Sequence, residues 1–291
     1  MMEQPAPQGW IYLFGPGIVA ASSFAVADVL VKVALNDGAD VLTLSTFRGL
    51  FSIAMMLIWL RLIPRPQPHT PRQRWIALGV GVLFAGIIFG LFQAIELVTV
   101  PVAVLSYFVY PLVTGIVAAL IGMERLGWRG LAAAVAAFIG LALTVGAQPG
   151  GVALAGVAFA FGAAVCRVTT LLIVRATLHE ADTRLTTWYT MLSSGVIFAA
   201  ISLLAWHWQG PQHLSGWLAM VALSAASVIS VIALFVSIKR IGPFRSALTM
   251  NLEPLMATAM SALFLGEIIT PIQALGGMIM LAALVAFQMR R

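Results

Sequence analysis

This 291-residue chain is 61% hydrophobic and only 9% charged, with a mean hydropathy of +1.02. It cannot build the surface of a soluble domain, which carries about 25% charged residues. Its net charge of +6 and pI near 10.2 come from basic residues that stand mostly at the ends of apolar runs, which indicates membrane topology and argues against nucleic-acid binding. Apolar runs long enough to cross about 30 Å of hydrocarbon recur throughout, so the sequence predicts an all-α membrane protein.

The predicted elements are ten apolar helices separated by charges, prolines and glycines. In chain order they cover residues 12–33, 41–62, 75–97, 101–122, 128–146, 151–176, 185–208, 214–238, 243–265 and 271–289. No basic segment precedes the first run and no clear cleavage site follows it, so we expect a retained helix and not a signal peptide. The longest connection, residues 61–74, contains prolines that exclude a helix through it.

Lys and Arg residues gather on one side of this predicted topology. That side carries Arg61, Arg65, Arg72, Arg74, Arg125, Arg129, Arg175, Arg184, Lys239, Arg240, Arg245, Arg290 and Arg291. The opposite side carries only Lys32. Because cytoplasmic loops are enriched in Lys and Arg, both termini are predicted to be cytoplasmic, which requires an even number of spans.

Residues 93–145 and 236–288 share the same landmarks when one segment is placed over the other. The aligned pairs include Pro111 with Pro254 and Glu124 with Glu267. Each copy contains a proline within a predicted helix, then a glutamate in the turn that follows this helix, and then a helix rich in Gly and Ala. With five spans in each half, residues 1–147 and 148–291 are predicted to be two inverted five-helix repeats. Inverted repeats are typical of transporters whose substrate site lies near the bilayer midplane.

Pro111 and Pro254 predict matching kinks on the two aligned helices. A proline inside a helix removes a backbone hydrogen bond and frees a carbonyl group, which must then face protein or a cavity. The kinks would act as hinges or shape the cavity. The alternative is that both prolines only shape helix packing.

The chain length, the doubled five-helix unit and the paired landmarks carry a resemblance to a known family. Over its whole length the chain resembles the ten-helix, EamA-type members of the drug/metabolite transporter superfamily, and among them it is most similar to bacterial exporters of aromatic amino acids. The resemblance implies a carrier in the bacterial inner membrane that moves small organic solutes outward, by alternating access, through a central cavity between two EamA-like repeats. Since one chain would hold both repeats, we expect a functional monomer.

Polar and aromatic side chains concentrate on six predicted helices, the first, third, fourth, sixth, eighth and ninth. A chamber for an amino acid with a large apolar side chain should be mostly apolar, with a few hydrogen-bonding groups. The candidate cavity residues are Ser22, Ser23, Phe24, Phe89, Gln93, Tyr107, Tyr110, Ser227, Ser230 and Asn251. For each of them the alternative is ordinary packing, or a hydrogen bond within its own helix.

Charged residues inside the predicted spans are rare and therefore informative, because an ionisable side chain near the bilayer centre is costly. Arg167 and Glu253 are predicted to lie at similar depth. We hypothesise that they pair, either as a gate on the cytoplasmic side of the cavity or as a structural link between two helices. A second group falls toward the outer helix ends and predicts an interfacial network or snorkelling side chains. Its members are Asp28, Lys32, Arg48 and Glu96.

Other functions are less compatible with these residues. The four histidines lie in predicted loops or at helix ends, and no HExxH motif or catalytic carboxylate pair is present, so we expect neither an enzyme nor a metal or other cofactor. Proton-coupled efflux of cationic drugs is the alternative function, because a cation would favour a central carboxylate and Glu253 could supply it. The superfamily's small four-helix multidrug members carry a central Glu in the first helix, whereas here that centre has serines. The expected partners are a small-molecule substrate and membrane lipids.

Overall fold

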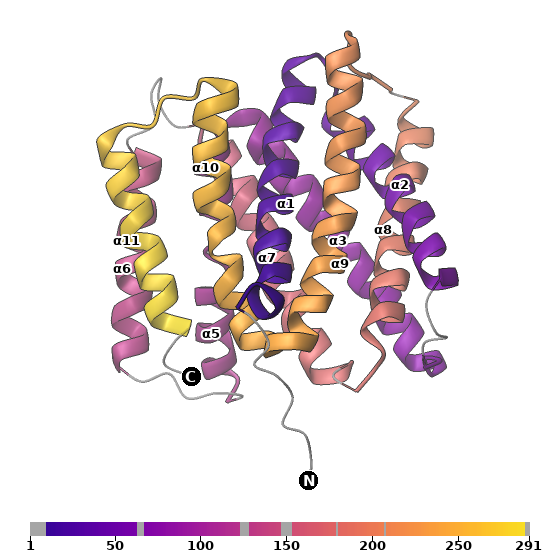
Figure 1. Cartoon of the computed structure of the whole chain (residues 1–291), viewed down its shortest axis with the longest axis horizontal. Helices are drawn as coiled ribbons and strands as arrows, with labels where there is room; N and C mark the ends of the chain where they lie inside the picture. The colour runs from indigo at the N-terminus through magenta and orange to yellow at the C-terminus, as the bar shows by residue number, and fades with distance from the viewer. Residues whose placement is uncertain are drawn as a thin grey trace.

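The computed structural model describes residues 10–62, 67–122, 128–146, 153–178, 180–206 and 208–288, and in these residues the regular structure is entirely helical. The helices are α1 (Trp10–Asn36), α2 (Val41–Leu62), α3 (Pro71–Leu97), α4 (Val100–Tyr107), α5 (Tyr110–Leu120), α6 (Trp128–Gly146), α7 (Leu154–Thr177), α8 (Thr183–Ala205), α9 (Leu214–Met250), α10 (Leu252–Leu265) and α11 (Pro271–Gln288). They form a bundle in which α1 begins and α11 ends at the same end, here called the basic end (Figure 1).

The bundle has the dimensions of a multi-pass membrane protein. Seven helical segments of the described residues are long and apolar enough to cross a bilayer, and three further apolar helices, within α6, α10 and α11, are shorter. Large hydrophobic side chains such as Leu263 and Phe264 are more than two-thirds exposed on the outer surface, which water would not tolerate over so large an area.

The predicted fourth helix is two helices, α4 and α5. Helix α4 ends at Tyr107, Phe108 caps its C-terminus, and α5 starts at Tyr110. Pro111 lies in the first turn of α5, where its missing N–H costs nothing because that group has no helical partner in a first turn. In place of the kink expected at Pro111, the helix is interrupted completely, just before the proline.

The second expected kink has the same form, and it corrects the predicted boundary between the eighth and ninth helices. Helix α9 continues through residues 239–242, predicted as a loop, and ends only at Met250, with its last part running across the bundle (Figure 1). Asn251 then separates α9 from α10, three residues before Pro254. Phe108 stands at the same distance before Pro111, so both interruptions occupy the same place relative to the aligned prolines.

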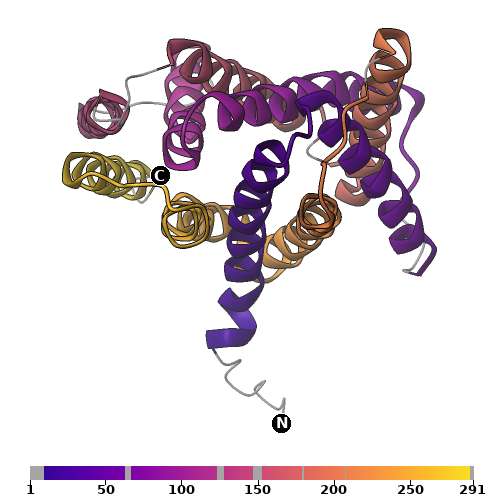
Figure 2. The ribbon, with the colours of Figure 1, turned by 90° about the horizontal axis from the view of Figure 1, so that it is seen from above.

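The helices enclose a central space between two walls. Seen from above, α1 stands between α9 and α10, and facing them are α3, α4 and α7 (Figure 2). Helices α6 and α11 lie together at one edge of the molecule (Figure 2). There the backbones approach closely, because a Cβ atom at Gly140 would lie 2.5 Å from the carbonyl oxygen of Gly276. Only glycine permits this contact.

Exposed tryptophans mark both ends of the bundle. Trp75 and Trp128, near the starts of α3 and α6, lie at the basic end, and both are about three-quarters exposed. Trp206, Trp208 and Trp217 lie at the opposite end. Tryptophan is enriched where a membrane protein meets the lipid headgroups, so these residues are placed as in an aromatic belt.

Candidate functional site

A cavity of about 290 Å³ lies in the central space of the bundle. It extends from Thr183, in the first turn of α8 at the basic end, to Arg48 and Phe92 deep in the bundle. The six helices predicted to wall it all contribute, and α2 and α8 do so as well. The cavity is therefore lined from both halves of the chain.

The cavity walls are mainly apolar and aromatic. Tyr107, Phe108 and Tyr110 come together because the interruption between α4 and α5 turns all three rings toward one another. The ring centroids are 5.2 Å apart for Tyr107 and Tyr110, and 5.6 Å apart for Phe108 and Tyr110. Phe24 and Phe84 add aromatic surface from α1 and α3. Such a wall suits an apolar or aromatic part of a solute.

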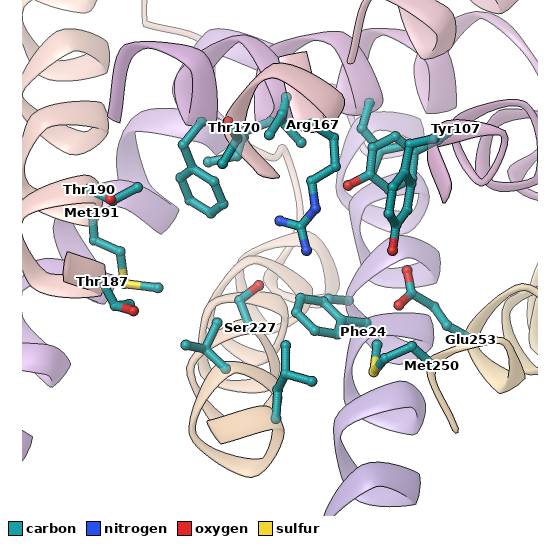
Figure 3. A pocket seen from close by; sticks show the side chains of 18 of the residues that line it. Phe24, Tyr107, Arg167, Thr170, Thr187, Thr190, Met191, Ser227, Met250 and Glu253 are labelled. Carbon is teal, nitrogen blue, oxygen red and sulfur yellow. The ribbon is translucent and has the colours of Figure 1, made fainter. Parts of the chain in front are cut away.

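Arg167 and Glu253 enter the cavity from different helices. The Arg167 side chain reaches in from α7, and the Glu253 carboxylate reaches in from α10 on the side of Tyr107 (Figure 3). The guanidinium carbon of Arg167 lies 5.6 Å from the ring centre of Tyr110. Both charged residues are described, and the structure contains no direct ion pair between them. The two residues thus line one cavity, and the ion pair hypothesised between them is not formed in this structure.

Asp28 and Arg48 also line this cavity, although the sequence placed them in an outer interfacial network. Both are buried. Arg48 Nε donates a hydrogen bond of 3.0 Å to Ser227 Oγ, and its guanidinium carbon lies 5.8 Å from the ring centre of Phe92. Asp28 Oδ2 is buried and has no hydrogen-bond partner. Among the described residues, the cavity is therefore lined by two carboxylates and two guanidinium groups.

A stripe of threonines on α8 lines the cavity toward the basic end, where Thr183 is exposed, and this part is here called its mouth. Thr183, Thr186, Thr187 and Thr190 share one face of the helix and line the cavity. His69 Nε2 lies 3.0 Å from Thr186 Oγ1, and burial lowers the pKa of this imidazole below its ordinary value. The sequence spacing of these threonines is a helical face pattern that could have identified them.

Asp182 fixes the start of this threonine stripe. Its side chain caps α8 by accepting a 2.9 Å hydrogen bond from the backbone N–H of Arg184, and it accepts another of 3.2 Å from the backbone N–H of Gln67. The side-chain hydrogen bond from Arg184 is the main cause that lowers the pKa of Asp182 to about 2. Asp182 thus joins α8 to the loop that leads into α3.

The end of the bundle opposite the mouth is closed by polar contacts, here called the outer closure. Lys32 Nζ donates to the carbonyl oxygens of Ile95, at 2.5 Å, and Val98, at 3.0 Å. The backbone N–H of Val100 donates to Glu267 Oε2 at 3.1 Å, and burial raises the pKa of this carboxylate. Of the predicted interfacial network, Lys32 and Glu96 meet here, because Lys32 Nζ also lies 3.3 Å from the backbone carbonyl oxygen of Glu96, whose carboxylate accepts from Gln93, whereas Asp28 and Arg48 line the cavity.

The predicted cavity residues divide into two groups. Those that line the cavity are Phe24, Tyr107, Tyr110, Ser227, Arg167 and Glu253. The others lie outside it: Ser22 donates to Ile18 O, Ser23 is half-buried on α1, Phe89 packs edge-on against Phe159, Gln93 contacts Glu96, Ser230 donates to Ser227 O, and Asn251 lines a separate hollow beside α11. Pro111 and Pro254 lie in the first turns of α5 and α10, next to the cavity, and do not line it. Glu124 lies outside the described residues.

Comparison with known proteins supports the same fold. The EamA-like transporter family matches the chain twice, over residues 9–146 and 154–288. A solved structure, titled only as the crystal structure of a protein, is 21% identical, covers 95% of this chain and 98% of its own, and superposes with a TM-score of 0.65. No curated protein matches the chain. Since the two family matches together span most of its length, the chain belongs to the EamA-like transporter family and is a membrane transporter of small solutes.

Proposed function

We propose that this transporter exports small hydrophobic metabolites, amino acids with aromatic side chains among them, through the central cavity by alternating access. The observation that carries this proposal is the cavity itself, whose apolar and aromatic walls hold a few charged groups. Its volume of about 290 Å³ is near the lower limit of small-molecule sites, roughly 300–1,000 Å³, and so favours an amino acid over a drug-sized molecule.

The balance of charge in the cavity supports a solute with no net charge. Among the lining residues that the structure describes, Asp28 and Glu253 are matched by Arg48 and Arg167. A sugar phosphate would favour an excess of positive groups, and a quaternary cation an excess of negative ones. A zwitterionic amino acid fits two groups of each sign.

The proposed transport cycle uses two inverted repeats, residues 1–147 and 148–291. The double family match and the equivalent interruptions before Pro111 and Pro254 support this division. The described basic residues near helix ends, such as Arg72 and Arg184, support a cytoplasmic basic end with both termini on that side, in a bacterial inner membrane. The cavity mouth then faces the cytoplasm, as an exporter requires for loading. One chain holds both repeats, so the proposed functional unit is a monomer.

Proton-coupled efflux of cations is the second candidate function. The observation that favours it is the presence of two carboxylates, Asp28 and Glu253, in one buried cavity. A carboxylate that faces the substrate path inside a membrane is the usual site at which proton movement is coupled to transport.

Transport into proteoliposomes that hold the purified protein separates the two candidates. Phenylalanine, a quaternary ammonium compound and a sugar phosphate are each tested with and without an imposed proton gradient. We expect phenylalanine uptake that saturates and does not depend on the gradient. Gradient-driven movement of the quaternary cation alone would replace the amino-acid proposal with the second candidate.

A further inference from the structure

Arg167 has unused hydrogen-bonding capacity inside the cavity. Its Nε atom is buried and has no hydrogen-bond partner, and its guanidinium group extends into the open space (Figure 3). Arg48, the other cavity arginine, differs because its Nε already donates to Ser227. A guanidinium donor that is removed from water is costly unless an acceptor pairs with it, and a carboxylate offers two acceptors in matching geometry.

Glu253 presents the opposite charge across the same space. It is 6% exposed, lines the cavity and lies in the first turn of α10, where the helix N-terminus favours a negative side chain. No direct ion pair connects it to Arg167. A buried carboxylate and a partly buried guanidinium group that face one cavity without touching leave room for a ligand that satisfies both.

An α-amino acid is such a ligand, since it carries a carboxylate and an ammonium group on one carbon atom. With its carboxylate at Arg167 and its ammonium group toward Glu253, its side chain lies among the aromatic rings that surround both residues. Tyr110 stacks on Arg167, and Phe24 and Tyr107 lie beside the two charged groups (Figure 3). Apolar residues of α3, such as Phe84 and Ile87, extend this surface deeper into the cavity.

We propose that Arg167 binds the substrate carboxylate and Glu253 the substrate ammonium group, so that the cavity selects zwitterionic α-amino acids over the corresponding amines and acids. This inference rests on the proposed amino-acid transport and names the two residues that determine its specificity. It also gives the absence of a direct Arg167–Glu253 contact a function, because a closed ion pair would exclude the substrate.

The first test uses the wild-type protein in proteoliposomes and measures inhibition of radiolabelled L-phenylalanine uptake. The competitors are unlabelled L-phenylalanine, 3-phenylpropanoate, which lacks the ammonium group, and 2-phenylethylamine, which lacks the carboxylate. We expect each analogue to need a concentration about tenfold or more above that of L-phenylalanine, since each leaves one of the two charged residues unpaired in the cavity. Equal inhibition by all three compounds would overturn the inference and leave amino-acid transport standing.

Variants then assign each charge to its residue. Arg167→Gln should raise the KM for L-phenylalanine about tenfold or more and abolish the preference for it over 2-phenylethylamine, while Arg167→Lys should retain part of that preference. Glu253→Gln should instead abolish the preference over 3-phenylpropanoate. Arg240→Gln is the matched control, because Arg240 also lies over a tyrosine ring, that of Tyr12, but outside the cavity.

The outcomes separate this inference from the proposed function. A folded Arg167→Gln protein, monodisperse in detergent, that keeps the wild-type KM and selectivity overturns the inference alone. If that variant does not fold, the competitor series on the wild-type protein decides. A wild-type protein that neither transports L-phenylalanine nor is inhibited by amino acids overturns the proposed function, and this inference with it.

Discussion

Asp182 illustrates how one side chain holds the cavity mouth in place. It caps α8, whose threonines line the mouth, and it also binds the backbone of Gln67 in the loop before α3. Loss of such a cap destabilises a protein by about 1 kcal/mol. The position of α8 therefore depends on a residue that does not line the cavity.

Asp182→Ala should lower the unfolding free energy by about 1 kcal/mol at neutral pH. The pKa of Asp182 is about 2 in the folded protein, below the ordinary 3.8. Its stabilisation is therefore fully present above pH 3.8 and is lost as the pH falls toward 2. Thermal unfolding in detergent should show a constant difference between wild type and variant from pH 7 to 5, which shrinks below pH 3.8.

Asp182→Asn is the control for this prediction. An asparagine keeps the cap but does not titrate, so this variant should differ from wild type by less than Asp182→Ala at neutral pH. A difference between wild type and Asp182→Ala that stays the same down to pH 3 would contradict the charge-based explanation.

At the scale of elements, the pair α6 and α11 depends on glycine contacts. Gly140→Ala places a methyl group 2.5 Å from the carbonyl oxygen of Gly276, so the helices must separate. We expect a loss of about 1–3 kcal/mol in unfolding free energy, measured by thermal unfolding in detergent. Gly162→Ala is the control, because a Cβ atom there meets nothing within 4 Å, and alanine favours the helix. Equal melting temperatures for both variants would refute the close-packing argument.

The existence of most helices could be predicted from the sequence, but the interruptions in two of them could not. Apolar residues surround Phe108, so hydropathy gives no sign of a helix end there, and the polar Asn251 is interpreted from the sequence as a cavity residue and not as a helix end. Proline in a sequence predicts a disturbed helix, yet Pro111 and Pro254 fit inside the first turns of new helices. The helix is therefore interrupted at the residues before each proline and not at the proline itself.

The cavity lining was predictable in part for a related reason. Sequence position gives the depth of a residue along a span, and this placed Arg167 and Glu253 at a common level. It does not give the direction of a side chain when a helix is apolar on every face. Asp28 and Arg48 were assigned to the membrane interface because they fall toward the outer ends of their predicted helices, whereas both line the cavity.

At the scale of the whole molecule, the cavity reaches the basic end, where the exposed Thr183 lines it, and the outer closure lies at the opposite end. The outer closure joins α1 to the end of α3 through Lys32, and the start of α4 to Glu267. The proposed alternating access requires these contacts to break when the cavity opens to the opposite side. Their strength then sets the balance between the two states.

Lys32→Gln should therefore increase access to the cavity from the outer side. Removal of hydrogen bonds from a charged group costs about 1.5 kcal/mol or more, a factor of about ten in the equilibrium. The measurement is the labelling rate, by a membrane-impermeant thiol reagent, of a cysteine placed at Thr170 in a Cys166→Ser background. Thr170 lines the cavity, and Arg240→Gln serves as a charge-neutralising control at the other end. Unchanged outer-side labelling in Lys32→Gln would show that the closure does not control access.

The separation of aromatic residue types has a spectroscopic consequence. The described residues that line the cavity include phenylalanine and tyrosine but no tryptophan, while exposed tryptophans lie at both ends of the bundle. Intrinsic fluorescence excited at the indole band therefore reports on the surrounding lipid and not on the bound solute. Brominated lipids should quench this emission strongly, whereas a saturating solute should leave it nearly constant. A tryptophan introduced at Phe84 would turn the same signal into a direct readout of cavity occupancy.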